Sequence, residues 1–342
     1  MQKVLCFGEV LLRYSPLPGT ASYKQKSMPV HIGGAELNVA TALCKWNIPV
    51  NYCTAIPDNF MSHAVKEYIS EIGINTSAIQ FCGDRLGVYY LLQGTDVKDS
   101  GIVFDRKGSS FTELTTGSVN WQQLFQDVDW FHLSAIAASL NANVAAVCME
   151  ALQIAKAMNI TVSIDLNYRD KLWQYGKRPA EIMTGLMQYC DLVMGNIWSA
   201  NSLLDVPIDD GIHNKGTKQA YLEHAQKTSE YLQSQYPNCK TITNTFRFDK
   251  GDSGIHYYAA LYTSDTLYDS PEFFSDHVVD KVGTGDCFMA GLIFGSKLGY
   301  DPRQLLNFAT AAAVGKLQEK GDTTNQSIQQ VLATLHQNQM EK

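Results

Sequence analysis

The chain has 342 residues, of which 45% are hydrophobic, and a formal net charge of −7. This length suits one large α/β domain or two ordinary ones, and the acidic balance argues against nucleic acid or an anionic membrane as the main partner. Its eight cysteines form no CxxC pair, the first residues lack a signal-peptide profile, and no apolar run approaches the ~18 residues that span a bilayer. We therefore expect a soluble, cytoplasmic protein with buried thiols.

Short apolar runs alternate with helical patterns along most of the chain. In order, the expected elements are a strand at 3–12, a helix at 35–46, a strand at 51–56, a helix at 61–73, a strand at 128–136, a helix at 143–158, a strand at 161–167, a helix at 180–190, strands at 191–196 and 240–246, a hairpin at 254–270, and helices from about 285 and at 326–337. This alternation is typical of βαβ units. The sequence predicts an α/β fold whose central, mostly parallel sheet is flanked by helices on both faces.

Two stretches, residues 12–32 and 85–112, interrupt the alternation with strand-like sequence and no intervening helix. Such strands do not join a parallel core easily, so we expect a small separate β-sheet that covers one end of the main domain as a lid. The polar stretch at about 205–236 is expected to be a surface insertion followed by a helix. With no repeat and no low-complexity tract, residues 1–342 are expected to form a single domain.

Residues suited to ligand binding follow several of the expected strands. They are Arg169, Asn196 and Arg247, each near a strand end, and Gly33 and Gly34 at the start of the first helix. Open parallel sheets bind ligands beyond the carboxyl ends of their strands. A binding crevice at that edge is therefore expected, although each arginine could instead be a solvated surface charge.

The segment "VGTGD" at residues 282–286 places two glycines and a carboxylate where a helix should begin. Backbone N–H groups at a helix N-terminus lack intrahelical partners and favour anions, and glycine lets a phosphate approach them closely. Asp286 would then lie beside the transferred group, where a carboxylate can act as general base. The alternative is a capped helix after a turn. The sequence has neither GxxxxGK[ST] nor a GxGxxG after the first strand, so P-loop and dinucleotide-binding readings are unsupported.

Together, "HIGGAELNVATAL" and "DKVGTGDCFMAGLIFG" resemble the two signature regions of the ribokinase-like (PfkB) carbohydrate kinases in order and spacing. This resemblance covers nearly the whole chain and implies a ribokinase-like fold and phosphoryl transfer from ATP to a sugar hydroxyl, with Mg²⁺. It also implies roles for particular residues: Asp286 as catalytic base, Gly283, Thr284 and Gly285 as the anion hole, Asp280 as the acid that opens the motif, and Gly33, Gly34 and Asn38 as sugar contacts.

Within the family, "GGAELNVA", "GVYYLL", "VFDRKGSS" and "DLNYR" are most similar to the 2-keto-3-deoxygluconate kinases. That resemblance implies that Tyr89, Arg106 and Arg169 contact a sugar acid, and the chemistry is consistent, because arginine offers a planar fork to a carboxylate. Phe104 stands where this subgroup usually has tyrosine, so one sugar hydrogen bond is expected to be missing.

Two further segments depart from the family pattern. The family often has NxxE where this chain has "NIWS", with Ser199 in place of the glutamate that is linked to magnesium and phosphate. Asn196 and Asp280 are assigned to this nucleotide and metal region, and no direct protein ligand to the metal is predicted. The segment "NTFRFDKGDSG" differs from the usual glycine-rich nucleotide loop, although its Arg247 could reach an ATP phosphate.

The sequence thus predicts an ATP-dependent kinase that phosphorylates the terminal hydroxyl of a keto-deoxy sugar acid, with no nucleic-acid or membrane partner. A fructokinase or other ketose kinase of the same fold is the nearest alternative, and a non-catalytic sugar-binding regulator is an alternative of another class. A homodimer that pairs two lids is also expected, on the view that the outer face of the lid carries apolar side chains. These are Val88, Tyr90, Leu92, Ile102 and Phe104.

Overall fold

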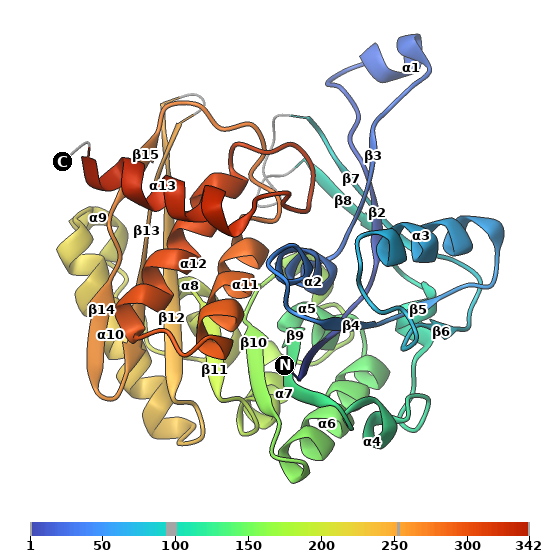
Figure 1. Ribbon diagram of the computed structural model, residues 1–342, viewed down its shortest axis with the longest axis horizontal. Helices are drawn as coiled ribbons and strands as arrows, with labels where there is room; N and C mark the ends of the chain where they lie inside the picture. Colours follow the sequence, from blue (N-terminus) through green and yellow to red (C-terminus); the bar gives the residue numbers. More distant parts are fainter. Residues whose placement is uncertain (1, 94–100, 252–253, 341–342) are drawn as a thin grey trace.

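A computed structural model describes residues 2–93, 101–251 and 254–340. The largest sheet in the described residues has nine strands (Figure 1). In spatial order these are β14 (Thr266–Asp269), β13 (Gly254–Thr263), β12 (Thr241–Lys250), β11 (Leu192–Gly195), β10 (Thr161–Asp165), β9 (Val128–Ser134), β1 (Lys3–Phe7) and β4 (Val50–Cys53), with β15 (Phe273–Ser275) paired to β13. The strands from β12 to β4 are parallel, while β13, β14 and β15 add an antiparallel edge. The predicted central sheet and late hairpin are confirmed.

The central strands carry apolar side chains on both faces, and helices cover both faces, so these strands are almost fully buried. One face carries α2 (Ala35–Lys45), α3 (Phe60–Glu71), α11 (Thr284–Lys297), α12 (Pro302–Lys316) and α13 (Ile328–Met340). The other carries α4 (Trp121–Leu124), α5 (Ala135–Ser139), α6 (Ala142–Ala157), α7 (Pro179–Met187), α8 (Ile197–Leu204), α9 (Ile212–Lys215) and α10 (Lys218–Gln235). Within the first layer α11 and α12 pack closely, which the glycine at 291 permits: a Cβ there would lie only 2.5 Å from the Ala309 Cα.

A second, four-stranded sheet stands beside the main one and forms an arm that reaches away from the body (Figure 1). Its strands, in spatial order, are β3 (Val30–Gly33), β2 (Leu11–Tyr14), β7 (Gly87–Leu91) and β8 (Ile102–Asp105), and α1 (Ala21–Gln25) lies at its far end. The expected small sheet is therefore present. The predicted strand at 3–12 is divided into β1 of the main sheet and the start of β2, so one continuous apolar run supplies both sheets.

The register of this small sheet contradicts one expectation about its faces. Tyr89 pairs with Phe104 and Leu91 with Ile102, whereas Tyr90 pairs with Val103. Side chains of paired residues lie on the same face. Ile102 and Phe104 therefore pack with Tyr89 and Leu91 on the inner face, and placing them on the outer face was wrong.

Residues 205–236 lie between α8 and β12 and contain α9 and α10. Helix α10 buries Tyr221, Ala225 and Leu232 and packs against α8, β12 and β13. It thus serves as the crossover helix between two parallel strands. Elsewhere, β5 (Ala55–Ile56) and β6 (Gln80–Phe81) form a two-stranded sheet, and the 3₁₀ turns η1 (Ser110–Glu113) and η2 (Asp170–Leu172) complete the described elements.

All eight cysteines are free thiols, as expected, and six of them are buried. Across the residues that the structure describes, no helix combines the length and the apolar character needed to cross a bilayer.

Candidate active site

A cavity of about 600 Å³ lies between the inner face of the small sheet and the carboxyl ends of β10, β11 and β12. Of the residues predicted for a site, the cavity is lined by Gly34, Asn38, Tyr89, Phe104, Arg106, Arg169, Asn196, Arg247, Gly283, Thr284, Gly285 and Asp286. Gly33 and Asp280 are not among the residues that line it. Segments as distant as α2, β7 and α11 therefore meet at the edge where an open sheet is expected to bind ligands.

The glycine turn before α11 is held in a conformation that only glycine suits. Gly283 has φ +78°, and a Cβ there would lie 1.9 Å from the Asp322 carbonyl oxygen. Thr284 begins the helix and its hydroxyl donates to the Lys281 carbonyl oxygen at 2.9 Å. The first N–H groups of this 14-residue helix consequently open toward the cavity, as an anion site requires.

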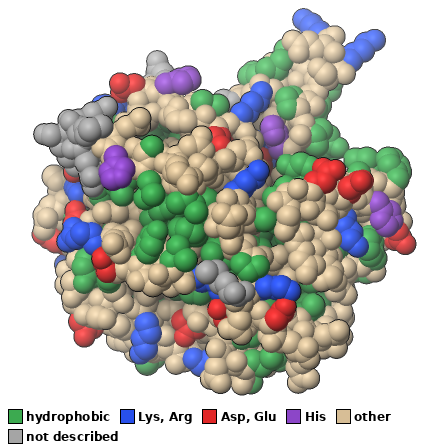
Figure 2. Space-filling model, in the orientation of Figure 1, with side chains coloured by type: hydrophobic (Ala, Val, Ile, Leu, Met, Phe, Trp, Pro, Cys, Tyr) green, Lys and Arg blue, Asp and Glu red, His purple; other side chains and the backbone are tan. Residues whose placement is uncertain are grey.

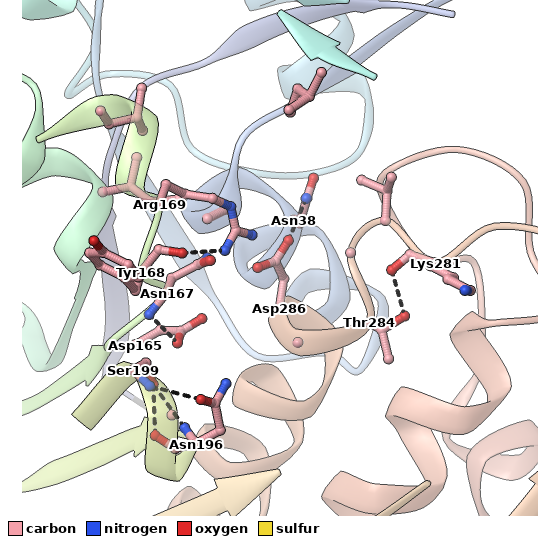
Figure 3. A pocket seen from close by; sticks show the side chains of 18 of the residues that line it. Asn38, Asp165, Asn167, Tyr168, Arg169, Asn196, Ser199, Lys281, Thr284 and Asp286 are labelled. Atoms are coloured by element: carbon pink, nitrogen blue, oxygen red, sulfur yellow. Dashed lines mark hydrogen bonds between the residues drawn. The ribbon is translucent and has the colours of Figure 1, made fainter. Parts of the chain in front are cut away.

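Asp286 lies in the first turn of α11 but makes no side-chain cap for that helix. Its Oδ2 accepts a hydrogen bond from Asn38 Nδ2 of α2 at 2.6 Å (Figure 3), and the side chain is almost fully buried. Burial raises the pKa of Asp286 to about 8; the Asn38 bond and Arg169 oppose this shift, while Asp165 and Glu36 add to it. A carboxyl with a pKa near neutrality, open to a cavity, suits general base catalysis better than capping.

A second carboxylate, Asp165, reaches the cavity from the end of β10. Its Oδ1 accepts a hydrogen bond from the Asn167 backbone N–H at 3.0 Å, and burial raises its pKa to about 6. The sequence analysis named Arg169 from the segment "DLNYR" but did not name Asp165, the first residue of that segment. The available signal was an acid as the last residue of a buried strand that points at the binding edge.

Arg169 follows the same strand and points across the cavity toward Asp286 and Asn38 (Figure 3). Its Nη1 donates to the Tyr168 carbonyl oxygen at 2.9 Å. The guanidinium lowers the pKa of both Asp165 and Asp286, so its charge acts on the two carboxylates. A cation in this position can receive an anionic group of a ligand without leaving the strand end.

Arg106 reaches the cavity from the small sheet and is already paired. Its Nη2 and Nε lie 2.5 and 2.7 Å from Glu9 Oε2, and Ser109 donates to the other Glu9 oxygen at 2.5 Å. Both side chains of the ion pair are more than nine-tenths buried. Glu9 was not foreseen, and it cancels the charge that Arg106 was expected to offer a ligand.

Asp280 belongs to a network behind the glycine turn. Its Oδ2 lies 2.9 Å from Arg13 Nη2, and Arg13 Nε lies 2.7 Å from Asp322 Oδ1. The other Asp322 oxygen accepts from the Tyr89 hydroxyl at 2.6 Å. Asp280 also accepts the Val282 N–H at 3.0 Å. It therefore ties the start of the turn to the small sheet, and Tyr89 presents its ring, with its hydroxyl proton directed to Asp322.

Asn196 and Ser199 form a reciprocal cap at the start of α8. Asn196 Oδ1 accepts from the Ser199 N–H at 2.8 Å, and Ser199 Oγ accepts from the Asn196 N–H at 2.9 Å. Ser199 stands where the family usually has glutamate, and its side chain is used in a capping box at the third position of the helix, which favours a polar residue.

Two further basic residues, Arg247 and Lys281, line the cavity. Arg247 comes from β12, and Lys281 precedes the glycine turn with its Nζ 2.6 Å from Asp249 Oδ1. Sequence reasoning named Arg247 but missed Lys281. Both charges lie on the cavity wall, where a polyphosphate could meet them.

The magnesium ion that the family resemblance implies can be tested against the donors present. The described residues contain no group of three His, Cys, Asp or Glu side chains that would form a protein cage. Mg²⁺ in phosphoryl-transfer sites commonly takes one or two carboxylates together with phosphates and water. Asp165 fits that requirement, whereas Asp280 is occupied by Arg13.

Comparisons with known proteins agree with this geometry. The model described as "pfkB family carbohydrate kinase" matches residues 1–329. The crystal structure of a 2-dehydro-3-deoxygluconokinase from Thermotoga maritima has a TM-score of 0.89 and 30% identity, covering 98% of this chain and 100% of that one. A 2-dehydro-3-deoxygalactonokinase of Haloferax volcanii is 24% identical over 94% of this chain and 92% of its own. A fructokinase with bound ATP from Xylella fastidiosa shares the fold at 19% identity and TM-score 0.75, covering 99% and 100%.

Proposed function

Since the chain belongs to the pfkB family of carbohydrate kinases, we propose that it transfers the γ-phosphate of ATP to the terminal hydroxyl of a 2-keto-3-deoxy sugar acid, with 2-keto-3-deoxygluconate as the expected substrate. The observation that carries this proposal is Asp286, a buried carboxyl with a pKa of about 8 at the mouth of a glycine-opened helix. The names of the Thermotoga and Haloferax relatives, both kinases of 2-dehydro-3-deoxy sugar acids, support the substrate class.

In this mechanism Asp286 accepts the proton of the sugar hydroxyl, and the freed oxygen attacks the γ-phosphorus in line with the leaving ADP. The N–H groups of Gly283, Thr284 and Gly285 receive the charge that develops on the transferred phosphoryl group. Arg247 and Lys281 hold the remaining phosphates. When bound, Mg²⁺ would neutralise phosphate charge, and Asp165 would hold it.

The substrate's carboxylate is assigned to Arg169, which lines the cavity opposite Asp286. Tyr89, Phe104, Gly34 and Asn38 complete the sugar site, and the apolar inner face of the small sheet excludes water that would otherwise accept the phosphoryl group. Arg106 contacts the sugar as a neutral pair with Glu9 rather than as an isolated cation.

The experiment that tests this function is ADP release by the purified protein with a panel of sugars and sugar acids. We expect kcat/KM for 2-keto-3-deoxygluconate to exceed that for fructose by roughly 10–10²-fold, because a charge-assisted hydrogen bond to Arg169 is available only to the acid. Equal kcat/KM values for the acid and for fructose would identify the protein as a ketose kinase instead. Sugar binding without any ADP formation would favour a regulator.

The outer face of the small sheet supports a homodimer through the lid. Val30, Tyr90 and Val103 are 50%, 38% and 59% exposed there, and the rings of Tyr14 and Tyr90 stack at 5.5 Å. Figure 2 shows the arm standing clear of the body with hydrophobic side chains along it. A second copy can cover this surface. Sedimentation should give a dimer at micromolar concentration, and a monomer would contradict the assignment. A cytoplasmic location is proposed with it, supported by the eight free thiols.

A further inference from the structure

Lys316, the last residue of α12, is a charged side chain with no exposed surface. Its Nζ donates to the Glu319 carbonyl oxygen at 3.1 Å. In the described part of the chain no carboxylate oxygen is recorded within 4.0 Å of that nitrogen. An ammonium buried without a contact ion pair is costly, so its position calls for a reason beyond packing.

The position lies directly behind the anion-binding turn. The Lys316 Cε is 3.4 Å from the point where a Cβ on Gly283 would be, and the same glycine packs on the Asp322 carbonyl. Burial lowers the pKa of Lys316, whereas Asp280, Glu319 and Asp322 act in the opposite direction. The ammonium and these carboxylates therefore share one layer beneath the first turn of α11.

Carboxylates outnumber cations in this layer, and the loss of Lys316 would increase that excess of negative charge. Arg13 is paired with both Asp280 and Asp322, at 2.9 and 2.7 Å, so one cation contacts two carboxylates, of which Asp322 is buried and Asp280 partly exposed. Without Lys316 as a second cation, a larger net negative charge would lie immediately behind N–H groups that must receive a phosphate. In a buried layer such a charge is poorly screened.

We propose that Lys316 is a positioning residue that supplies compensating positive charge beneath the anion hole, allowing the glycine turn to accept the phosphoryl group of ATP. This inference rests on the proposed function, because it takes the turn to be the phosphoryl site. Lys316 touches neither substrate nor reacting atoms. It acts through Gly283 and through the field of Asp280 and Asp322.

The first test replaces Lys316 with methionine, which keeps much of its length and removes its charge. We expect kcat to fall about tenfold or more, by analogy with the 10²–10³-fold cost of removing a direct anion-hole donor. Lys297→Met is the matched control. Lys297 is also buried, but it pairs with Asp129 at the opposite end of α11, so its loss should leave kcat within about twofold.

The second test separates charge balance from packing. Asp322→Asn returns the net charge of the layer in Lys316→Met to its wild-type value, and the asparagine can still accept from Arg13 while donating to the Tyr89 hydroxyl. We expect kcat of the double variant to return to within about threefold of wild type, a recovery that a purely steric role would not give.

Several outcomes would overturn the inference: an unchanged kcat in Lys316→Met, no recovery in the double variant, or loss of kcat in Asp322→Asn alone. If Lys316→Met does not fold, Asp322→Asn in the otherwise native chain still decides the matter. Its extra positive charge should lower KM for ATP, and a higher KM contradicts charge balancing. A wild-type protein that forms no ADP would instead refute the proposed function itself.

Discussion

Arg106 and Arg169 both line the cavity, but they reach it from two sides that handle charge differently. On the side of the small sheet, Arg106 is bound to Glu9 within 2.5 Å. On the side of the strand ends, Arg169 faces Asp165 and Asp286, whose pKa values burial raises to about 6 and about 8. On the small-sheet side the arginine is already paired with a carboxylate, whereas the strand-end side, with two carboxyls of raised pKa, is the one that we propose exchanges a proton and receives an anion.

This difference separates two uses of the same residue type. Arg106, buried and paired with Glu9, holds the small sheet against the cavity. Arg169 lies beside carboxyls of raised pKa, and its proposed role is to bind the substrate and to lower the pKa of the base, Asp286. Lining a cavity is therefore weak grounds for assigning a charge to the ligand. The charges that already surround the residue decide its role. Substitutions of charged residues on the strand-end side should therefore lower activity, and substitutions of charged residues on the small-sheet side should lower stability.

The largest effect is expected on the strand-end side, from Asp286→Asn. Asparagine keeps the shape of the side chain and its contact with Asn38 but cannot accept a proton. We expect kcat to fall by about 10²–10⁴-fold while ATP binding is largely retained. Steady-state kinetics and calorimetric titration with a non-hydrolysable ATP analogue measure the two quantities. A kcat close to wild type would reduce Asp286 to a structural residue.

On the opposite side, Arg106→Met should damage stability more than chemistry. It leaves Glu9 buried without its partner, which typically costs about 3–5 kcal/mol. Denaturant unfolding should show this loss in the single variant. The double variant Arg106→Met/Glu9→Gln removes both charges and should recover most of the stability. A single variant that is fully stable but binds substrate poorly would show that Arg106 acts on the ligand, and would contradict the structural role assigned to its pairing with Glu9.

The raised pKa of Asp286 also predicts a pH-dependent stability. Below about pH 4 the carboxyl is protonated in both folded and unfolded chains, so this contribution to stability is fully present. As pH rises toward 8, the unfolded chain releases the proton first and the folded state loses that advantage. Asp286→Asn should therefore match wild type near pH 4 and become more stable by an increasing margin, on the order of several kcal/mol at pH 8. Thermal or denaturant unfolding at four or five pH values measures the margin, and a constant difference would contradict the assigned pKa.

Arg169→Leu is the corresponding test of recognition. Removing the guanidinium should erase most of the roughly 10–10²-fold preference in kcat/KM for 2-keto-3-deoxygluconate over fructose, because a charge-assisted hydrogen bond contributes about 1.5–3 kcal/mol. Activity toward the neutral sugar should change much less. A preference that survives in Arg169→Leu would mean that another residue receives the carboxylate.

Sequence patterns predicted most of the fold and the residues of the glycine turn, because these depend on local periodicity and on glycine's conformational freedom. They did not predict Glu9 beside Arg106, or Arg13 beside Asp280, which are 97 and 267 residues apart. Such partners are set by how the two sheets meet, and no local pattern records it. The face of Ile102 was misassigned for a similar reason, since alternation within one strand gives two faces but only the register with β7 says which is buried.

Ser199 gives the smallest expected effect and bears on the remaining departure from the family pattern. Its hydroxyl completes the cap with Asn196 at the start of α8, on the strand-end side of the cavity. Ser199→Ala removes one of the two capping bonds and should cost about 1 kcal/mol of stability. If capping is the whole role, kcat and the Mg²⁺ concentration that gives half-maximal activity should not change, because Asp165 and the phosphates hold the metal. Ser199→Thr, which keeps the hydroxyl, is the matched control and should retain the stability. A marked rise in the Mg²⁺ requirement of Ser199→Ala alone would show that the serine acts in the glutamate's place after all, and would move the metal site from β10 toward α8.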